Sequence, residues 1–560
     1  MAAAHFAVLD YVVLVGFLVL SAGIGVFFAW RDRRAGSNKH FLTGNRELSW
    51  LPVSMSMMAS FLSSIAILGL PSEVFLRGST IWTGAISSSL AVLVAAFVFL
   101  PMYYKMDITS INELLYMGVV LYGPSLALGS VTGIPVWSSI LLNGVVCTFY
   151  TAIGGIKAVV WTDVVQMILI YVGYIMVIAS GIYHLGGFGN MWQIAGDGGR
   201  LIFVNFSTSL YDTYTTWNVV LGWTIGWMAA YCASQTQVQR YSSMKSLKRA
   251  RRALLLNIPG VALTLLLSVL SGLTIYAVYR DCDPTLTGDI DKADQLMPYI
   301  VQDLLRNYPG LSGLLVASVF SGSLSTLSSG YNALAAVTWD DFVRPRVNIS
   351  EGAALRLTKL MAAAYGLLSI SIAFLTGTME SIIQASASLV GALSGPLLAI
   401  FVLGTFFPCC KKKGAITGIL VAMATSWWLA LGSIIYPRDA DDLPTSTAGC
   451  TDFNQTITAG SFDPPPLPSG IFQFYHISFI WIGIVGFITH MVVSLAVSLV
   501  FERNEKEEVN PKYICPFVRQ YMSNYVKKST DNVLKEPLPT TTITAGSFDP
   551  PPLPRSASTI

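Results

Sequence analysis

Long apolar runs separated by short polar segments recur along most of the chain. A membrane-spanning helix needs roughly 20 apolar residues, and by that rule we expect about thirteen spans. The first run has no basic residue before it, so we expect a retained helix rather than a cleaved signal peptide. The predicted spans are Tyr11–Trp30, Leu51–Leu76, Ala85–Tyr104, Leu114–Val131, Val136–Tyr150, Trp161–Tyr183, Trp217–Gln235, Ala253–Tyr279, Leu311–Val337, Leu357–Thr376, Ser381–Phe407, Gly414–Tyr436 and Ile471–Val500.

Composition supports lipid as the solvent for these runs. Hydrophobic residues make up 53% of the 560 residues, charged residues 12%, and the mean hydropathy is +0.60. Soluble domains carry roughly 25% charged residues, so there are too few charges here to cover a soluble surface of this size. The net charge of +3 gives no indication of a nucleic-acid partner. We therefore predict an all-α polytopic membrane protein.

Basic residues collect in the segments after the first, seventh, ninth and eleventh predicted spans. If every span crosses once, all four segments lie on one side, which the positive-inside rule assigns to the cytoplasm. The N-terminus is then extracellular and the C-terminus cytoplasmic, in a multi-pass protein that we place in the plasma membrane. The basic residues are Arg31, Arg33, Arg34, Lys39 and Arg46; Arg240, Lys245, Lys248, Arg249, Arg251 and Arg252; Arg344, Arg346 and Arg356; and Lys411, Lys412 and Lys413.

The segments on the opposite side carry extracellular features. Asn205 and Asn454 begin glycosylation sequons, the second within the predicted extracellular loop 437–470. Cys282 and Cys450 are the only cysteines predicted to be outside. An oxidising compartment permits a disulfide between them, but two free thiols are equally compatible with the sequence.

The chain after Val500 is polar and proline-rich, and we expect residues 501–560 to form a disordered cytoplasmic tail. Its last residues, Ser558–Ile560, could pair with a sheet edge in a scaffold domain that captures C-termini, although such tripeptides also arise by chance. The run TITAGSFDPPPLP occurs at 456–468 and again at 542–554. The two copies fall on opposite predicted sides of the membrane, and we have no physical account of the duplication.

Two hydroxyl-rich runs interrupt otherwise apolar spans, at 54–65 (SMSMMASFLSSI) and at 321–332 (SGSLSTLSSGYN). Transporters bind ions near the bilayer midplane where helices break and backbone carbonyls become free. Hard cations prefer oxygen ligands, which the hydroxyls of Ser325 and Thr326 and freed carbonyls could supply to sodium. The alternative is that small residues allow close packing of membrane helices.

Other polar and aromatic positions have two interpretations each. Asp163 lies near the inner end of the sixth span, where a carboxylate is costly and usually functional, but it could also cap the helix. Trp227 and Tyr231 share one helix face and could line a substrate cavity or pack within the bundle. The sequence contains no histidine constellation, phosphate-binding loop or nucleophile elbow, so we expect neither an enzyme nor ATP-driven transport.

Several long stretches resemble the sodium/solute symporter family, in the branch of sodium-coupled monocarboxylate, multivitamin and iodide carriers. They extend from Phe41 to about Tyr436. The stretches are FLTGNRELSWLPVSMSMMASFLSS, LGLPSEVF, YMGVVLYGPSLAL, TAIGGIKAVVWTDVVQ, QTQVQRY, DCDPTLTG, SGSLSTLSSGYNALAAVTWDD and SGPLLAIFVLGTFFP.

The resemblance implies a leucine-transporter-type fold with a core at 51–407. Two inverted five-helix repeats, 51–183 and 217–407, would form that core, and segments 1–50 and 408–500 would be additions. It also implies sodium-coupled secondary active symport by alternating access, with the bilayer and a small organic anion as partners. The anion would be a monocarboxylate or a vitamin such as biotin or pantothenate.

The resemblance further implies site residues. Sodium would be bound by oxygens of Ala59, Leu62, Gly322, Ser325 and Thr326. The ion would leave past Asp163, Gln166 and Gln235. The substrate cavity would be lined by Phe61, Ser63, Ala66, Trp227 and Tyr231.

The sequence departs from the family's pattern in two places. Iodide carriers have glutamine at Ala66 and another polar amide near Ser87, so we expect an organic anion instead. We expect its carboxylate to be recognised by helix-end dipoles and hydroxyls, because no arginine falls within a predicted span. In this chain Glu113 is followed directly by Leu114. The family normally has a further segment at this point, which contains the start of the fourth span, so the fourth span is shortened here. The alternative function is therefore a non-transporting membrane protein, either a sensor or an inactive splice variant.

Overall fold

The computed structural model describes residues 6–32, 38–103, 120–121, 124–125, 127–129, 132, 134–376, 382–436, 441–450, 457–461 and 470–502. Helices dominate these ranges, as expected where lipid cannot satisfy backbone hydrogen bonds. In the first half the helices are α1 (Val8–Arg31), α2 (Asn38–Thr43), α3 (Trp50–Phe61), α4 (Ser64–Arg77), α5 (Gly84–Val94), α6 (Leu100–Tyr103), α8 (Val136–His184), α9 (Phe188–Asp197), α10 (Trp223–Ala233), α11 (Gln235–Ser242), α12 (Leu247–Leu255) and α13 (Asn257–Tyr279).

The second half continues the same architecture. Its helices are α14 (Leu296–Leu304), α15 (Leu311–Val337), α16 (Glu351–Thr376), α17 (Ile382–Phe406), α18 (Lys412–Ile435), α19 (Phe472–Tyr475) and α20 (Phe479–Phe501). Short 3₁₀ turns are η1 (Gly44–Arg46), η2 (Ser79–Thr83) and η5 (Ala293–Gln295), and π-helical turns are η3 (Ala95–Phe99), η4 (Asn218–Gly222) and η6 (Thr338–Val343).

Within the described ranges, nine helices are long and apolar enough to cross a membrane, and the bent pair α3–α4 makes a tenth. The count of thirteen spans stays a prediction. The fourth predicted span, Leu114–Val131, lies mostly outside the described residues, and so does the shortened segment before it. The seventh is divided between η4 and α10, each too short to be counted.

Helix α8 contains two spans that the sequence predicts separately. It is 49 residues long, and its backbone leaves helical geometry at Gly155, which has a φ of 60°. Such a φ is accessible to glycine at little cost. Tyr150, before this point, donates a hydrogen bond to the carbonyl oxygen of Leu324 on α15. Gly173, after it, packs against Ser318, nearer the start of α15. The second part of α8 therefore runs back along α15.

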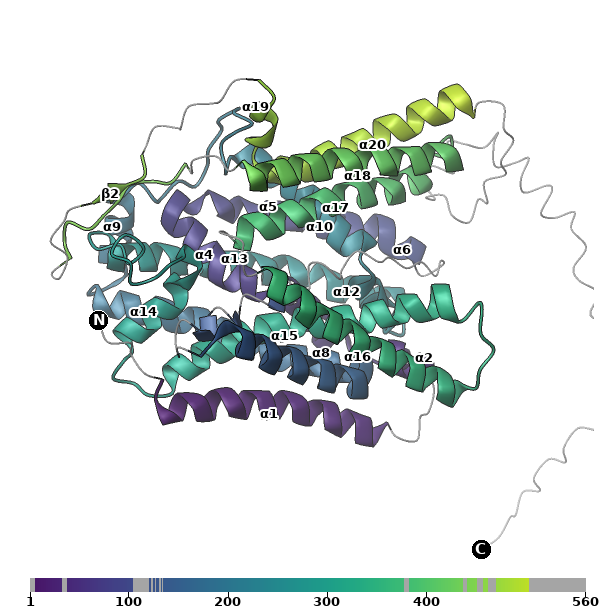
Figure 1. The fold of residues 1–560 in the computed structure, drawn as a ribbon, viewed down its shortest axis with the longest axis horizontal. Helices are drawn as coiled ribbons and strands as arrows, with labels where there is room; N and C mark the ends of the chain where they lie inside the picture. Colours follow the sequence, from purple (N-terminus) through teal and green to yellow (C-terminus); the bar gives the residue numbers. More distant parts are fainter. Residues whose placement is uncertain are drawn as a thin grey trace, which may run out of the picture.

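Burial separates central from peripheral helices. The apolar window of α15 is 83% buried, whereas the windows of α1 and α16 are 33% buried and that of α20 is 22% buried. Figure 1 shows α15 inside the bundle, α1 along one edge and α20 along the opposite edge. The apolar outer residues of the edge helices are the surface that lipid would cover.

A small sheet and a disulfide close the end of the bundle that the sequence predicts to be extracellular. Strand β1 (Thr445–Ser446) pairs antiparallel with β2 (Thr458–Ala459), which belongs to the first copy of the duplicated run. Cys450 forms a disulfide with Cys282, with a Cα–Cα distance of 5.0 Å. The pairing that the sequence leaves open is thus formed in the structure. We name residues 441–450 the outer strap.

The outer strap is also held by charges at the outer end of α4. Arg77 forms ion pairs with Glu73, Asp441 and Asp442. Arg200 donates a hydrogen bond to the carbonyl oxygen of Leu443 and stacks on the ring of Tyr276 at 3.9 Å. Burial lowers the pKa of Arg200 to about 10 and raises the pKa of Asp442 above its usual value. The outer strap therefore connects the end of α4 to segments from the middle of the chain.

Candidate functional site

Two helix breaks face each other near the centre of the bundle. Helix α3 ends at Phe61, Leu62 has a non-helical ψ of 67°, and α4 begins at Ser64 after a bend of 58°. Helix α10 ends at Ala233 and α11 begins after Ser234, whose ψ of 132° is extended. Small polar residues at both points favour non-helical backbone, because they gain less from remaining helical than alanine or leucine does. The first break lies within the predicted hydroxyl-rich run 54–65, whereas the second was not predicted.

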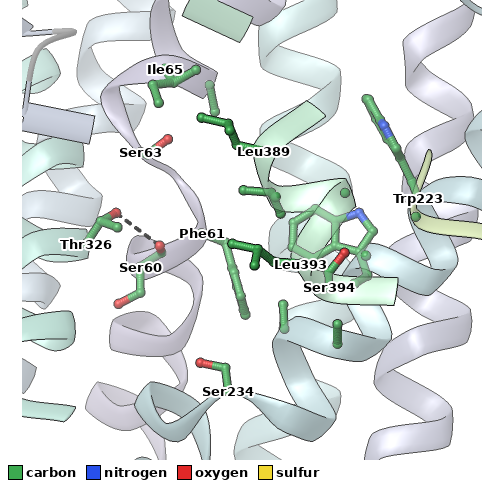
Figure 2. Close-up of a pocket in the computed structure, with 18 of the residues that line it drawn as sticks. Ser60, Phe61, Ser63, Ile65, Trp223, Ser234, Thr326, Leu389, Leu393 and Ser394 are labelled. Carbon is green, nitrogen blue, oxygen red and sulfur yellow. Dashed lines mark hydrogen bonds between the residues drawn. The ribbon is translucent and has the colours of Figure 1, made fainter. Parts of the chain in front are cut away.

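A cavity of about 420 Å³ lies between the two breaks. Figure 2 shows Ser63 and Ser234 at opposite sides of it, with Phe61 and Leu393 between them. Its polar lining residues are Ser60, Ser63, Ser234, Thr236, Gln237, Thr326, Ser329 and Ser394, and its larger apolar ones include Phe61, Ile65, Trp223, Trp227, Leu389, Leu393, Phe479 and Ile480. Such a mixed lining can receive a ligand that has one polar end and an apolar body.

Four of the five residues expected around a substrate line this cavity, namely Phe61, Ser63, Ala66 and Trp227. The fifth, Tyr231, is fully buried behind them. Its ring centroid is 4.6 Å from that of Phe61 and 6.0 Å from that of Trp227. Tyr231 therefore supports the aromatic wall instead of forming it.

Two helices that the sequence did not indicate also contribute to the cavity. Residues Leu389 to Leu397 of α17 and residues Phe479 to Gly483 of α20 line one side. A Cβ atom on Gly395 would lie 1.9 Å from the carbonyl oxygen of Gly483, so these two helices can approach only because the residues are glycines. Glycines spaced along apolar runs were the available signal, but such spacing is common in membrane helices.

Oxygen atoms from α3 and α15 converge beside the first break. Thr326 Oγ1 donates to the carbonyl oxygen of Ser60 at 3.0 Å, as drawn in Figure 2, and lies 3.1 Å from that of Gly322. The Leu62 carbonyl oxygen is 2.7 Å from the position that a Cβ on Gly322 would occupy. Among the described residues, the buried Ser325 hydroxyl has no hydrogen-bond partner.

The expected sodium ligands therefore come from segments that the fold brings together. The last carbonyl groups of α3, including that of Ala59, lose the donors of a following helical turn because the helix stops there. The C-terminal end of a helix is also the negative end of its dipole. The Ser325 hydroxyl belongs to the same stretch of α15 as Gly322 and Thr326, and hydroxyl and carbonyl oxygens are the ligands that a hard cation prefers.

A buried ion pair lies next to the same cavity. Arg240 on α11 contacts Asp163 on α8 at 3.1 Å, and the two side chains are 1% and 0% exposed. Arg240 also donates to Ser60 at 2.5 Å and to Ser329, both of which line the cavity. Ser56 donates to Asp163 at 2.5 Å. The ion pair of Arg240 and Asp163 thus lies beside the cavity, on the side of α11.

This ion pair corrects the expectation that Arg240 belongs to a basic cytoplasmic loop and that no arginine lies inside the bundle. The break at Ser234 changes the course of the chain, so that α11 points Arg240 inward. Gln166, one turn after Asp163 on α8, is also fully buried. Both amide atoms of Gln166, and Oε1 of Gln235, have no hydrogen-bond partner among the described residues. The three residues expected on an ion path are therefore all buried polar groups.

Comparison with known proteins agrees with this fold. The profile of the sodium:solute symporter family matches residues 41–117 and 113–422. The chain belongs to this family of membrane transporters. The two matched segments overlap at 113–117, the place where the sequence predicts a segment shorter than the family pattern.

Individual members of the family and one solved structure are similar to the chain over most of its length. The chain is 38% identical to human sodium-coupled monocarboxylate transporter 2, over 91% of this chain and 87% of that protein. It is 37% identical to human sodium-coupled monocarboxylate transporter 1, over 93% and 91%, and 35% identical to the rabbit sodium-dependent multivitamin transporter, over 92% and 86%. A Na⁺-coupled sialic acid symporter in an outward-open state has the same fold, with a TM-score of 0.70 and 21% identity over 89% of this chain and 98% of that one. The predicted leucine-transporter-type helical fold is confirmed.

Proposed function

We propose that this protein uses a sodium gradient to carry a small organic anion, a monocarboxylate or a vitamin acid, by alternating access. The observation that carries the proposal is the cavity between two broken helices, bordered on one side by oxygen atoms of α3 and α15; among these, in the described part of the chain, the Ser325 hydroxyl has no hydrogen-bond partner. The names of the relatives support both the ion and the substrate class. In alternating access, each conformational state opens the cavity to one side of the membrane only. The breaks allow the two halves of each broken helix to move separately.

We propose the sodium site at the carbonyl oxygens of Ala59 and Leu62, with oxygens of Gly322, Ser325 and Thr326. The buried Ser325 hydroxyl supports this placement, because a polar group without a partner is costly in a dry interior. A bound cation would satisfy that hydroxyl. It would also join α3 to α15, which is how sodium binding could prepare the neighbouring cavity for substrate.

One of two helix N-termini, at opposite sides of the cavity, would receive the substrate carboxylate. Helix α4 begins at Ser64 and α11 begins at Gln235, and both starts lie at the cavity. The N-terminal end of a helix attracts anions through its free N–H groups and its dipole. Hydroxyls of Ser63 and Ser234 can add hydrogen bonds. The apolar body would then lie against Phe61 and Trp227.

The cavity size favours the larger members of the substrate class. Pockets that enclose drug-sized ligands have volumes of about 300–1,000 Å³, and 420 Å³ falls inside this range. Vitamin acids or ring-bearing monocarboxylates would fill more of the apolar wall than a three-carbon acid would. More apolar area removed from water means tighter binding.

We also propose plasma-membrane insertion with the N-terminus outside and the C-terminus inside. The basic segments 245–252 and 411–413 support this orientation. Glycosylation at Asn205 is part of the same proposal, whereas Asn454 and the tail with Ser558–Ile560 lie outside the described residues. The proposed division into segments 1–50, 51–407, 408–500 and 501–560 follows the repeat boundaries.

Uptake into sealed vesicles tests the function. Purified protein would be reconstituted and supplied with labelled lactate, nicotinate or biotin under an inward gradient of sodium or of choline. We expect sodium to drive accumulation of at least one of the three acids, and protein-free vesicles to show none. Equal uptake in sodium and choline for all three would contradict the proposal and favour the non-transporting alternative.

A further inference from the structure

A second cavity, of about 240 Å³, lies away from the transport site, at the end of the bundle that we propose to be cytoplasmic. Four elements form it: the end of α1, helix α2, the bend of α8 near Gly154, and the beginning of α16. A single water needs only about 10–15 Å³, so this space can receive a substantial polar group. We name it the basic cavity.

Cations outnumber anions in the basic cavity. Lys157 and Lys359 both line it, against one carboxylate, that of Asp32. Lys157 lies 3.7 Å from Asp32 and donates to Nε2 of His40 at 2.8 Å. The other ring nitrogen of His40, Nδ1, lies 3.6 Å from the carboxylate of Asp32. One positive charge is left in excess.

The excess charge belongs to Lys359. Its ammonium group lies 5.5 Å from the ring centroid of Phe41 and donates at 3.4 Å to the carbonyl oxygen of Ile153. Within the described part of the chain, no carboxylate lies within ion-pair distance of it. Lysines near membrane helix ends usually extend toward water, whereas this one points into a cavity. A cation held inward without a counter-charge indicates a site for an anion.

The surroundings of the basic cavity are those of a lipid-facing surface. Helix α1 lies at the edge of the bundle (Figure 1). Next to the lining residues of α1, Phe27 and Trp30 are 50% and 65% exposed, and Leu360, next to Lys359, is 66% exposed. Acyl chains could lie along these apolar residues while a headgroup enters between the two helices. Basic pockets between membrane helices on the cytoplasmic side are suited to anionic headgroups.

We propose that the basic cavity binds the phosphate group of an anionic phospholipid. Lys157 and Lys359 contact the phosphate oxygens, and the Phe41 ring and the end of α1 form the apolar side. The site includes the residues directly before Gly155, where α8 reverses. A bound lipid therefore holds α1, α2 and α16 against the bend that leads to Asp163. Binding itself does not depend on transport.

Purified full-length protein in a neutral detergent tests the proposal with four probes. Dioctanoyl phosphatidic acid carries headgroup and chains, glycerol 3-phosphate and inorganic phosphate carry only the anion, and dioctanoyl phosphatidylcholine carries chains with no net charge. We expect phosphatidic acid to raise the unfolding temperature and the other three probes to have little effect. An equal effect of glycerol 3-phosphate would overturn the lipid assignment in favour of a soluble phosphate compound. An equal effect of phosphatidylcholine would show that charge plays no part.

The lysines are tested by a double variant, Lys157→Gln with Lys359→Gln. Each lysine near an anionic surface contributes about fivefold to affinity, so the double variant should bind phosphatidic acid roughly 30-fold more weakly. The matched control is Lys245→Gln with Lys248→Gln, which removes the same charge from exposed positions and should bind as the parent does. Lys359→Arg keeps the charge and should retain most of the binding, which separates charge loss from misfolding. Unchanged binding by the double variant would overturn the site, whatever the uptake assay shows.

Discussion

The two helix breaks at the transport cavity differ in what they bring to it. The break between α3 and α4 leaves neutral oxygens beside Thr326 and Ser325 of α15. The break between α10 and α11 instead carries Arg240, a fixed cation, to Asp163. The first break can therefore bind a cation, whereas the second already carries the cationic side chain of Arg240. Under the proposed repeats 51–183 and 217–407, each of these breaks falls in the first span of its repeat, so the two corresponding positions have opposite electrostatic roles.

The largest expected effect on stability comes from removing the carboxylate of Asp163, which is the counter-charge of Arg240. Asp163→Asn leaves Arg240 buried without a counter-charge, which should cost about 3–5 kcal/mol of unfolding free energy. Combining it with Arg240→Met removes both charges and should recover part of that loss. Unfolding in detergent, followed for the single variants and the double variant, measures the coupling. If Asp163→Asn cost less than about 1 kcal/mol, the pair would not hold α11 in place.

A smaller effect is expected where the first break packs on α15. In Gly322→Ala, the new Cβ would lie 2.6 Å from Ile67 and 2.7 Å from the Leu62 carbonyl oxygen. Such overpacking should cost about 1–3 kcal/mol, and sodium-driven uptake should fall with it because the oxygens are displaced. Gly352→Ala on α16 is the control, because its Cβ would meet nothing within 4 Å. Equal uptake by the two variants would contradict a close approach of α3 to α15.

The smallest effect on stability, with a clear effect on sodium, is expected at Ser325. Its hydroxyl has no partner among the described residues, so Ser325→Ala should leave the unfolding free energy almost unchanged. Losing one contact to a charged group should cost about 1.5–3 kcal/mol of ion binding, or roughly tenfold or more in the sodium concentration for half-maximal uptake. Ser321→Ala on the same helix is the control, because within the described ranges that hydroxyl bonds only to the carbonyl oxygen of Ala317. An unchanged sodium dependence in Ser325→Ala would remove Ser325 from the proposed site.

The sequence predicted the first break much better than the second. Five serines between positions 54 and 64, followed by Gly69 and Pro71, stand out from an apolar span. Ser234 instead falls at the very end of a predicted span, where a polar residue is ordinary. The same boundary placed Arg240 with Lys245 and the other basic residues, because distance along the chain was the only available guide. Its burial depends on a change of direction that one extended residue produces.

The architecture followed more directly from the residues than the cavity did. Apolar runs of span length have one stable solution in lipid, so the helices were predictable. The cavity wall from α17 and α20 was not, because it depends on which helices lie side by side. The position of Gly483 opposite Gly395 is a matter of tertiary packing, and similar glycines occur throughout the chain.

The outer strap has a consequence for how the protein is made. Cys282 and Cys450 are 168 residues apart, and the ribosome must complete α18 before the second thiol exists. Two of the three carboxylates around Arg77 arrive with the same late segment. Until then Cys282 has no disulfide partner, and only one of the three carboxylates around Arg77, that of Glu73, is present. The contacts of Arg77 and Cys282 are therefore complete only after residues 441–450 have been synthesised.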